Sequence, residues 1–142
     1  MKLNDAKIDA VKFEQGAWVG EKYDTPIPEM GDLCLKVRGI NNADWRRLQQ
    51  KLYEAVPRSK RIGGRIDPDE MDRITTSCLL SACLIDWENV EGDDGQPLEY
   101  SRPAATKILT DPEMRRFREA VVWAANVVGE QGAEDSKEIV GN

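Results

Sequence analysis

The sequence of 142 residues contains no histidine. Catalytic triads, cysteine–histidine pairs and histidine-ligated zinc sites all need an imidazole group, so these chemistries are excluded. Aromatic residues are also scarce, at 6% of the chain. Catalysis would have to rest on carboxylates, lysine or thiol groups alone. We therefore predict a protein that is not an enzyme and that carries no cofactor.

Cysteine is rare as well, with Cys34, Cys78 and Cys83 forming an odd-numbered set. Four residues separate the last two, which is not the close pair that zinc ribbons use. On a helix, side chains five positions apart point in different directions, because each residue turns the chain by about 100°. We predict reduced thiols in the core and no metal site.

Long apolar runs are absent too. The longest apolar stretch without a charge, residues 74–85, also contains threonine, serine and cysteine and is too short to cross a bilayer. The charged N-terminus, Met1-Lys2-Leu3-Asn4-Asp5, does not resemble a signal peptide. These features predict a cytosolic protein without a membrane segment.

Familiar ligand-binding motifs are incomplete. Gly63 and Gly64 lie between two arginines but lack the lysine and hydroxyl residue of a phosphate-binding loop, so they indicate a flexible connector. The acids around Asp94 do not fit the calcium-binding loop and indicate a turn. The acids from Asp67 to Asp72 suit a helix N-terminus, where negative charge is favourable.

Residues 1–40 have the pattern of short strands broken by turns. Residues 11–13 and 17–19 are short β-type runs on either side of Gly16, and residues 33–38 alternate between apolar and basic side chains. This part therefore predicts a small antiparallel sheet.

Residues 41–128 have helical spacing and clear start signals. Asn42 is suited to cap one helix that ends at Pro57, and Asp67-Pro68 begins a second helix with an apolar stripe reaching Ile85. A hairpin around Asp94 then precedes helices that begin at Ser101 and Asp111. We predict a single α+β domain, residues 1–128, in which an N-terminal antiparallel sheet packs against about four helices. Residues 129–142 are predicted to form a flexible, disordered acidic tail.

Charge is distributed very unevenly along the chain. Residues 36–65 contain nine basic and two acidic side chains, a net charge of +7, whereas the rest has 11 basic and 24 acidic side chains, a net charge of −13. The total charge of −6 is therefore the sum of a strongly basic segment and a strongly acidic remainder. Candidate protein-contact residues lie in the basic segment, although core packing is the favoured interpretation of the first of them: Trp45, Arg46, Arg47, Lys51, Arg58, Arg61 and Arg65.

Three interpretations of the basic segment compete. It can be a solvated face, a surface that neutralises nucleic-acid phosphates, or one half of a polar protein contact. Nucleic acid is disfavoured by the acidic total charge and by the lack of a recognised binding motif. The third interpretation predicts head-to-tail homo-oligomers, because the complementary charge is present in the same chain.

The order of turn and cap residues resembles a known family. Residues 31–48 are similar to the basic strand, Asn-containing turn and Arg-rich helix of small tail-module proteins of long-tailed bacteriophages. Further along follow, in order, Asp86-Trp87, Asp94-Gly95-Gln96-Pro97, Tyr100-Ser101 and Leu109-Thr110-Asp111-Pro112. Over residues 31–128 this progression resembles the tail assembly chaperone family of siphophage-type viruses.

The resemblance implies an assembly factor of the host cell cytoplasm that is absent from the finished virion. Such chaperones coat the tape measure protein, keep it soluble and deliver it to tail tube subunits. They are often made in a second, longer form by a programmed frameshift, and Gly141-Asn142 is compatible with a slippery codon pair. Two alternatives stay open: a structural head-tail connector or tail-terminator subunit, and a small nucleic-acid-binding regulator.

Overall fold

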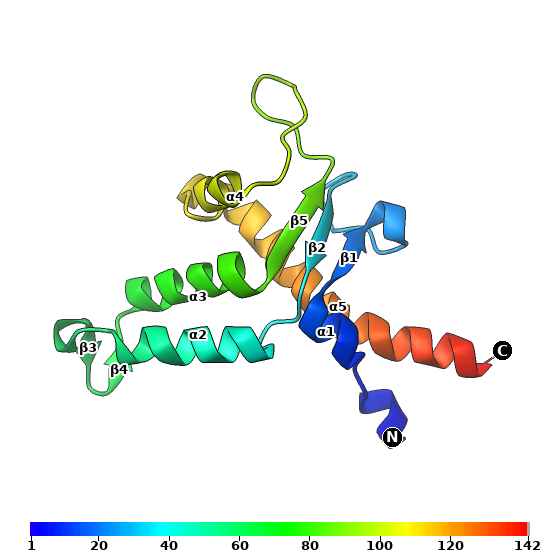
Figure 1. Cartoon of the computed structure of the whole chain (residues 1–142), viewed down its shortest axis with the longest axis horizontal. Helices are drawn as coiled ribbons and strands as arrows, with labels where there is room; N and C mark the ends of the chain where they lie inside the picture. The colour runs from blue at the N-terminus through cyan, green and yellow to red at the C-terminus, as the bar shows by residue number, and fades with distance from the viewer. Residues whose placement is uncertain (142) are drawn as a thin grey trace.

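Three short strands form an antiparallel sheet at the centre of the computed structural model, which describes residues 1–141, with side chains for residues 1–130 (Figure 1). The sheet order is β1 (Ala17–Gly20), β2 (Cys34–Val37), β5 (Leu84–Glu88). Strand β2 is central, so both of its edges are hydrogen-bonded. Between Lys36 and Val37 the pairing with β5 is interrupted by an irregularity of the bulge type.

Helices surround this sheet and extend away from it. They are α1 (Ala10–Gln15), α2 (Ala43–Glu54), α3 (Pro68–Ala82), α4 (Arg102–Leu109) and α5 (Arg115–Gly141). Helix α5 packs against β1 and β2, whereas α2 and α3 lie side by side and project from the sheet (Figure 1). A small hairpin, β3 (Arg61–Ile62) and β4 (Arg65–Ile66), connects their far ends. The α+β prediction is confirmed, with five α-helices in the described chain where about four were expected.

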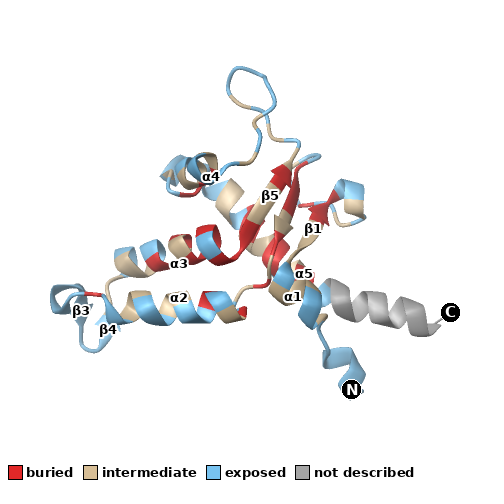
Figure 2. Ribbon diagram, viewed as in Figure 1, coloured by how far each residue is buried: buried red, intermediate tan, exposed pale blue. Residues whose placement is uncertain are grey.

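One hydrophobic core joins the sheet to α3, α4 and α5. Leu35 and Val37 on β2, Leu79 on α3 and Val121 on α5 are fully buried. Buried residues gather around the sheet and the neighbouring part of α3, and the far ends of α2 and α3 are largely exposed (Figure 2). The projecting helices are therefore anchored at one end only.

The third strand corrects the sequence prediction. The apolar stripe of the second helix is predicted to reach Ile85, but α3 ends at Ala82 and Cys83 leaves helical geometry. Strand β2 supplies the reason, since it pairs Leu35 with Trp87 and Lys36 with Asp86. Tertiary pairing with an exposed strand edge outweighs local helical periodicity at this point.

The N-terminal segment also differs from the prediction of strands. Residues 11–13 are part of α1, because the Asp9 carboxylate accepts hydrogen bonds from the backbone N–H groups of Val11 and Lys12, both at 3.1 Å. This N-cap is the sequence feature that indicates a helix here. The strand predicted at residues 17–19 and that predicted at 33–38 are both confirmed as β1 and β2.

The helix start signals are confirmed at three positions. Asn42 caps α2, Ser101 caps α4, and Pro68 occupies the first turn of α3. The Asp67 side chain, however, makes no capping hydrogen bond, so the start of α3 depends on Pro68 and on tertiary contacts. A turn with Gly95 at φ 75° closes the predicted hairpin around Asp94.

The predicted tail begins within α5. Gly129 is buried and Glu130 is exposed, and both continue the helix. The remainder of the predicted tail, residues 131–142, lies outside the residues whose side chains are described. Among the described helices, none combines the length and the apolar character that crossing a membrane requires.

Candidate functional site: a basic arm

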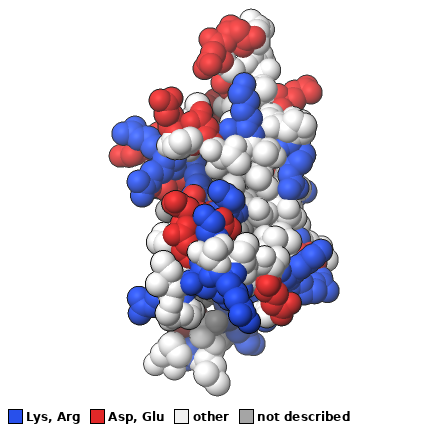
Figure 3. Space-filling model, turned by 90° about the vertical axis from the view of Figure 1, so that its left-hand side faces the viewer, with Lys and Arg blue, Asp and Glu red and all other residues white. Residues whose placement is uncertain are grey.

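Residues 43–66, which comprise α2, β3, β4 and the turns between them, form a projecting element that we name the basic arm. Its exposed cations are Arg46, Arg47, Lys51, Arg58, Lys60, Arg61 and Arg65. Viewed from the end of the arm, acidic side chains occupy the upper tip of the molecule, and basic side chains are spread over the rest of this face with a few acidic ones among them (Figure 3). The structure thus places the six basic candidates predicted from the sequence on one element.

Most of these cations have no partner for their side chains within residues 1–130. Among the described side chains, no hydrogen bond or ion pair is made by Arg46, Lys51, Arg58, Lys60 or Arg65. Long charged side chains that lack partners keep their full hydration, which is lost only when a partner of opposite charge is bound. Their charge is therefore available to a ligand or to another protein.

Two arginines of the arm have structural roles instead. Arg61 donates hydrogen bonds from Nε to the carbonyl of Val56, at 3.2 Å, and from Nη2 to the carbonyl of Tyr53. These bonds satisfy the carbonyl of Val56 and give that of Tyr53, which already accepts from the Val56 N–H, a second donor, so they fix the hairpin to the C-terminal end of α2. Arg47 forms an ion pair with Asp44 one turn earlier on the same helix.

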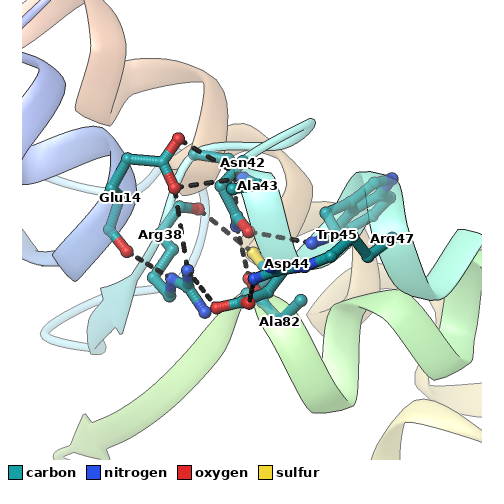
Figure 4. A network of polar contacts seen from close by, with 10 residues as sticks. Glu14, Arg38, Asn42, Ala43, Asp44, Trp45, Arg47 and Ala82 are labelled. Carbon is teal, nitrogen blue, oxygen red and sulfur yellow. Dashed lines mark hydrogen bonds and ion pairs between the residues drawn. The ribbon is translucent and has the colours of Figure 1, made fainter.

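The base of the arm is fixed by a polar network centred on Arg38 (Figure 4). Its Nε donates to the carbonyl of Glu14 at 2.6 Å, and its Nη2 donates to the Asp44 carboxylate at 2.7 Å. The Glu14 carboxylate in turn accepts from the backbone N–H of Ala43 at 3.0 Å. Hydrogen bonds from Arg38 and, to a smaller extent, from Arg47 lower the pKa of the Asp44 carboxyl. The network joins α1, β2 and the first turn of α2.

Asn42 forms the buried part of the same network (Figure 4). Its Oδ1 accepts from the backbone N–H of Trp45 at 2.9 Å. Its Nδ2 donates to the carbonyls of Gly39 at 2.8 Å and Ala82 at 2.6 Å. One side chain therefore caps α2 and ties it to the C-terminal end of α3.

Close packing near this network requires glycine at residue 39. A Cβ atom added to Gly39 would lie 2.0 Å from the ring of Phe13, and the Gly39 N–H donates to the Phe13 carbonyl at 2.8 Å. The backbone can approach the ring this closely only because residue 39 has no side chain. This contact holds α1, which also packs against α5, beside the connection between β2 and α2.

Trp45 has a different role from the other candidates. It is 3% exposed and belongs to the core between α2 and the body of the protein. Of the two interpretations open to it, core packing is the one that its burial supports. Its indole Nε1 is buried without a hydrogen-bond partner among the described residues.

Ile62 is an arm residue that the sequence analysis missed. It is 78% exposed at the tip of the β3–β4 hairpin, next to Arg61 and two residues from Gly64. An exposed isoleucine among cations is a typical apolar centre for a binding surface. Its position between a basic turn and two glycines is the pattern that would have identified it.

An open groove of about 860 Å³ lies between α3 and the α4–α5 connection. Its floor includes Leu80 and Leu109, but its cations are already paired with carboxylates. Arg118 binds Asp72 and Arg73 binds Glu70. The cations of the groove are therefore less available to bind an acidic partner than those of the basic arm.

The cysteines are buried and free, as predicted. Burial raises the pKa of all three thiols, and that of Cys83 to about 12. The described part of the chain has no group of three or more histidine, cysteine or acidic residues placed to hold a metal ion.

A family model described as "YdaY prophage protein" matches residues 40–142. The chain belongs to this prophage family. The matched region includes the basic arm, and its phage origin agrees with the viral setting that the sequence resemblance implies. No curated protein and no solved structure matches the chain.

Proposed function

We propose that this protein is a phage tail assembly chaperone that binds the tape measure protein and tail tube subunits in the host cell cytoplasm. The observation that carries the proposal is the basic arm, which projects from the core with five cations that have no partner among the described side chains. Membership of a prophage family and the similarity over residues 31–128 support the viral context.

The arm suits binding because it is fixed at its base and because five of its exposed cations have no side-chain partner among the described residues. The Arg38 and Asn42 networks fix its orientation relative to the sheet, which lowers the entropic cost of presenting the surface. Opposite charge on a partner would increase the rate of association and select the correct orientation. The protein acts, in this proposal, by association rather than by catalysis.

A chaperone and a structural subunit are distinguished by the composition of the virion. We expect mass spectrometry of purified particles to find no copies of the chain, and lysates of induced cells to contain it bound to the tape measure protein. Stoichiometric amounts in purified particles would replace the proposal with a head-tail connector or tail-terminator subunit. The nucleotide sequence of the gene separately tests for a frameshifted longer form.

One feature favours a second candidate, a nucleic-acid-binding regulator. A basic hairpin with an apolar tip, Ile62, resembles the arms that insert side chains into the minor groove. Salt-dependent retardation of DNA or RNA by the purified protein would support this function. Absence of binding at low salt would end it.

A further inference from the structure

The charge complement of the basic arm lies elsewhere on the same molecule. Residues 89–99 form a loop that projects from the end of β5 (Figure 1). Its shape is fixed by backbone hydrogen bonds from Gly92 to Gln96, at 2.9 Å, and from Leu98 to Val90, at 2.7 Å. A bridge between Glu91 and Pro97 closes it. The loop is therefore an ordered protrusion.

All charged residues of this loop are acidic and exposed. They are Glu91, Asp93, Asp94 and Glu99. None of them makes an ion pair with a described side chain, although Asp94 accepts a hydrogen bond from the backbone N–H of Gln96 at 3.0 Å. The loop contains no basic residue that could neutralise these acids. Acidic side chains accordingly stand out at the upper tip of the molecule (Figure 3).

The tip of the arm and the loop each carry an exposed apolar residue near charged residues, and the charges of the two are opposite. At the tip of the arm, exposed Ile62 lies among Arg58, Lys60 and Arg65. On the loop, exposed Pro97 lies among four acids. A small apolar centre within a charged rim is the usual composition of a protein–protein contact.

A single copy does not bring the two surfaces together. The loop projects beyond β5, and the tip of the arm lies beyond the far ends of α2 and α3 (Figure 1). No ion pair links them among the described side chains. The two complementary surfaces therefore do not contact each other within one molecule.

We infer that the tip of the basic arm binds the acidic loop of a second copy of this chain. The two surfaces differ, so the contact is head-to-tail and each bound copy leaves one arm and one loop free for the next. Such a contact produces rings or filaments, which would array copies along an extended partner. The inference rests on the proposed function in taking the arm as a protein-binding surface, and it names one partner of that surface.

Charge reversal in trans tests this contact with the purified chain alone. Sedimentation velocity at about 50 mM and about 500 mM salt should show assemblies only at the lower concentration, because screening weakens the contact. The variants Arg58→Glu/Arg65→Glu and Asp93→Lys/Asp94→Lys should each weaken self-association by at least about 10-fold. A mixture of the two variants should restore it, since each supplies the charge that the other lacks.

Lys107→Glu/Arg116→Glu provides the matched control, because it makes the same charge change at exposed positions outside the arm. We expect it to associate like the wild type. Equal association of the wild type and the arm variant, or no rescue in the mixture, would overturn the inference. The sedimentation experiment contains no tape measure protein, so that result would not contradict the proposed function, which is tested separately.

Discussion

The buried side chain of Asn42 makes three hydrogen bonds at the base of the arm. Asn42→Ala removes the cap of α2 and leaves the carbonyl of Ala82 without its donor, whereas the carbonyl of Gly39 keeps the backbone N–H of residue 42. Losing a cap costs about 1 kcal/mol, and leaving the Ala82 carbonyl unpaired costs about 1–3 kcal/mol. We expect the free energy of unfolding to fall by about 3 kcal/mol in denaturant titration.

Asn42→Asp is the informative companion variant. It keeps the capping oxygen but places a carboxylate against two carbonyl oxygens, so it should destabilise the protein at least as strongly as alanine at neutral pH. A loss below about 0.5 kcal/mol for either variant would show that the buried network contributes little.

The cysteine thiols provide a second prediction at this scale. Because burial raises the pKa of Cys34, Cys78 and Cys83, their reactive thiolate forms are disfavoured at pH 8. A thiol reagent should label none of the three in the native protein and all three in denaturant. Rapid labelling of Cys83, whose pKa is raised to about 12, would contradict the packing around α3.

At the scale of elements, the junction between β2 and α2 is sensitive to pH through Asp44. Its folded pKa is lowered from 3.8, first by Arg38 and then by Arg47. A lowered pKa stabilises the folded state above the unfolded value and loses that effect as the pH falls through the folded value. The stabilisation should therefore be fully present at neutral pH and be lost progressively as the pH falls below about 4.

Carbon-detected NMR titration measures this effect directly at the Asp44 carboxyl. Arg38→Gln should return its pKa most of the way to 3.8, and Arg47→Gln should have a smaller effect. The opposite order would mean that the exposed pair on α2 dominates, and that Arg38 does not fix the base of the arm.

Elements with strong local caps could be predicted from the sequence. Asn42, Ser101 and Pro68 mark the starts of α2, α4 and α3, because these residue types satisfy or avoid the free N–H groups of a first helical turn. Strand β5 could not be predicted in this way. Its pairing with β2 brings together segments about fifty residues apart, and helical periodicity continues across the boundary at Cys83.

At the scale of the whole molecule, the uneven distribution of charge could be predicted from the sequence. Which basic side chains bind partners within the fold could not. Counting charges identifies the basic segment, but only the structure shows that Arg38 and Arg61 bind internal carbonyls while Arg58 and Arg65 do not. The burial of Trp45 and the exposure of Ile62 likewise depend on how α2 packs on the body. Local sequence does not contain that information.

Capture of the tape measure protein by variants of the arm tests the central claim most directly. Tagged wild-type protein, Arg46→Glu/Lys51→Glu and the control Lys107→Glu/Arg116→Glu would be recovered from lysates of cells that express the tape measure and tail tube genes. Arg46 and Lys51 lie on α2, away from the hairpin tip, whereas Lys107 and Arg116 lie on α4 and α5, and all four residues are exposed. We predict that the wild type and the control retain the tape measure protein. The amount recovered with the α2 variant should be at least about 10-fold lower. Equal capture by all three proteins, or capture by none, would contradict the account.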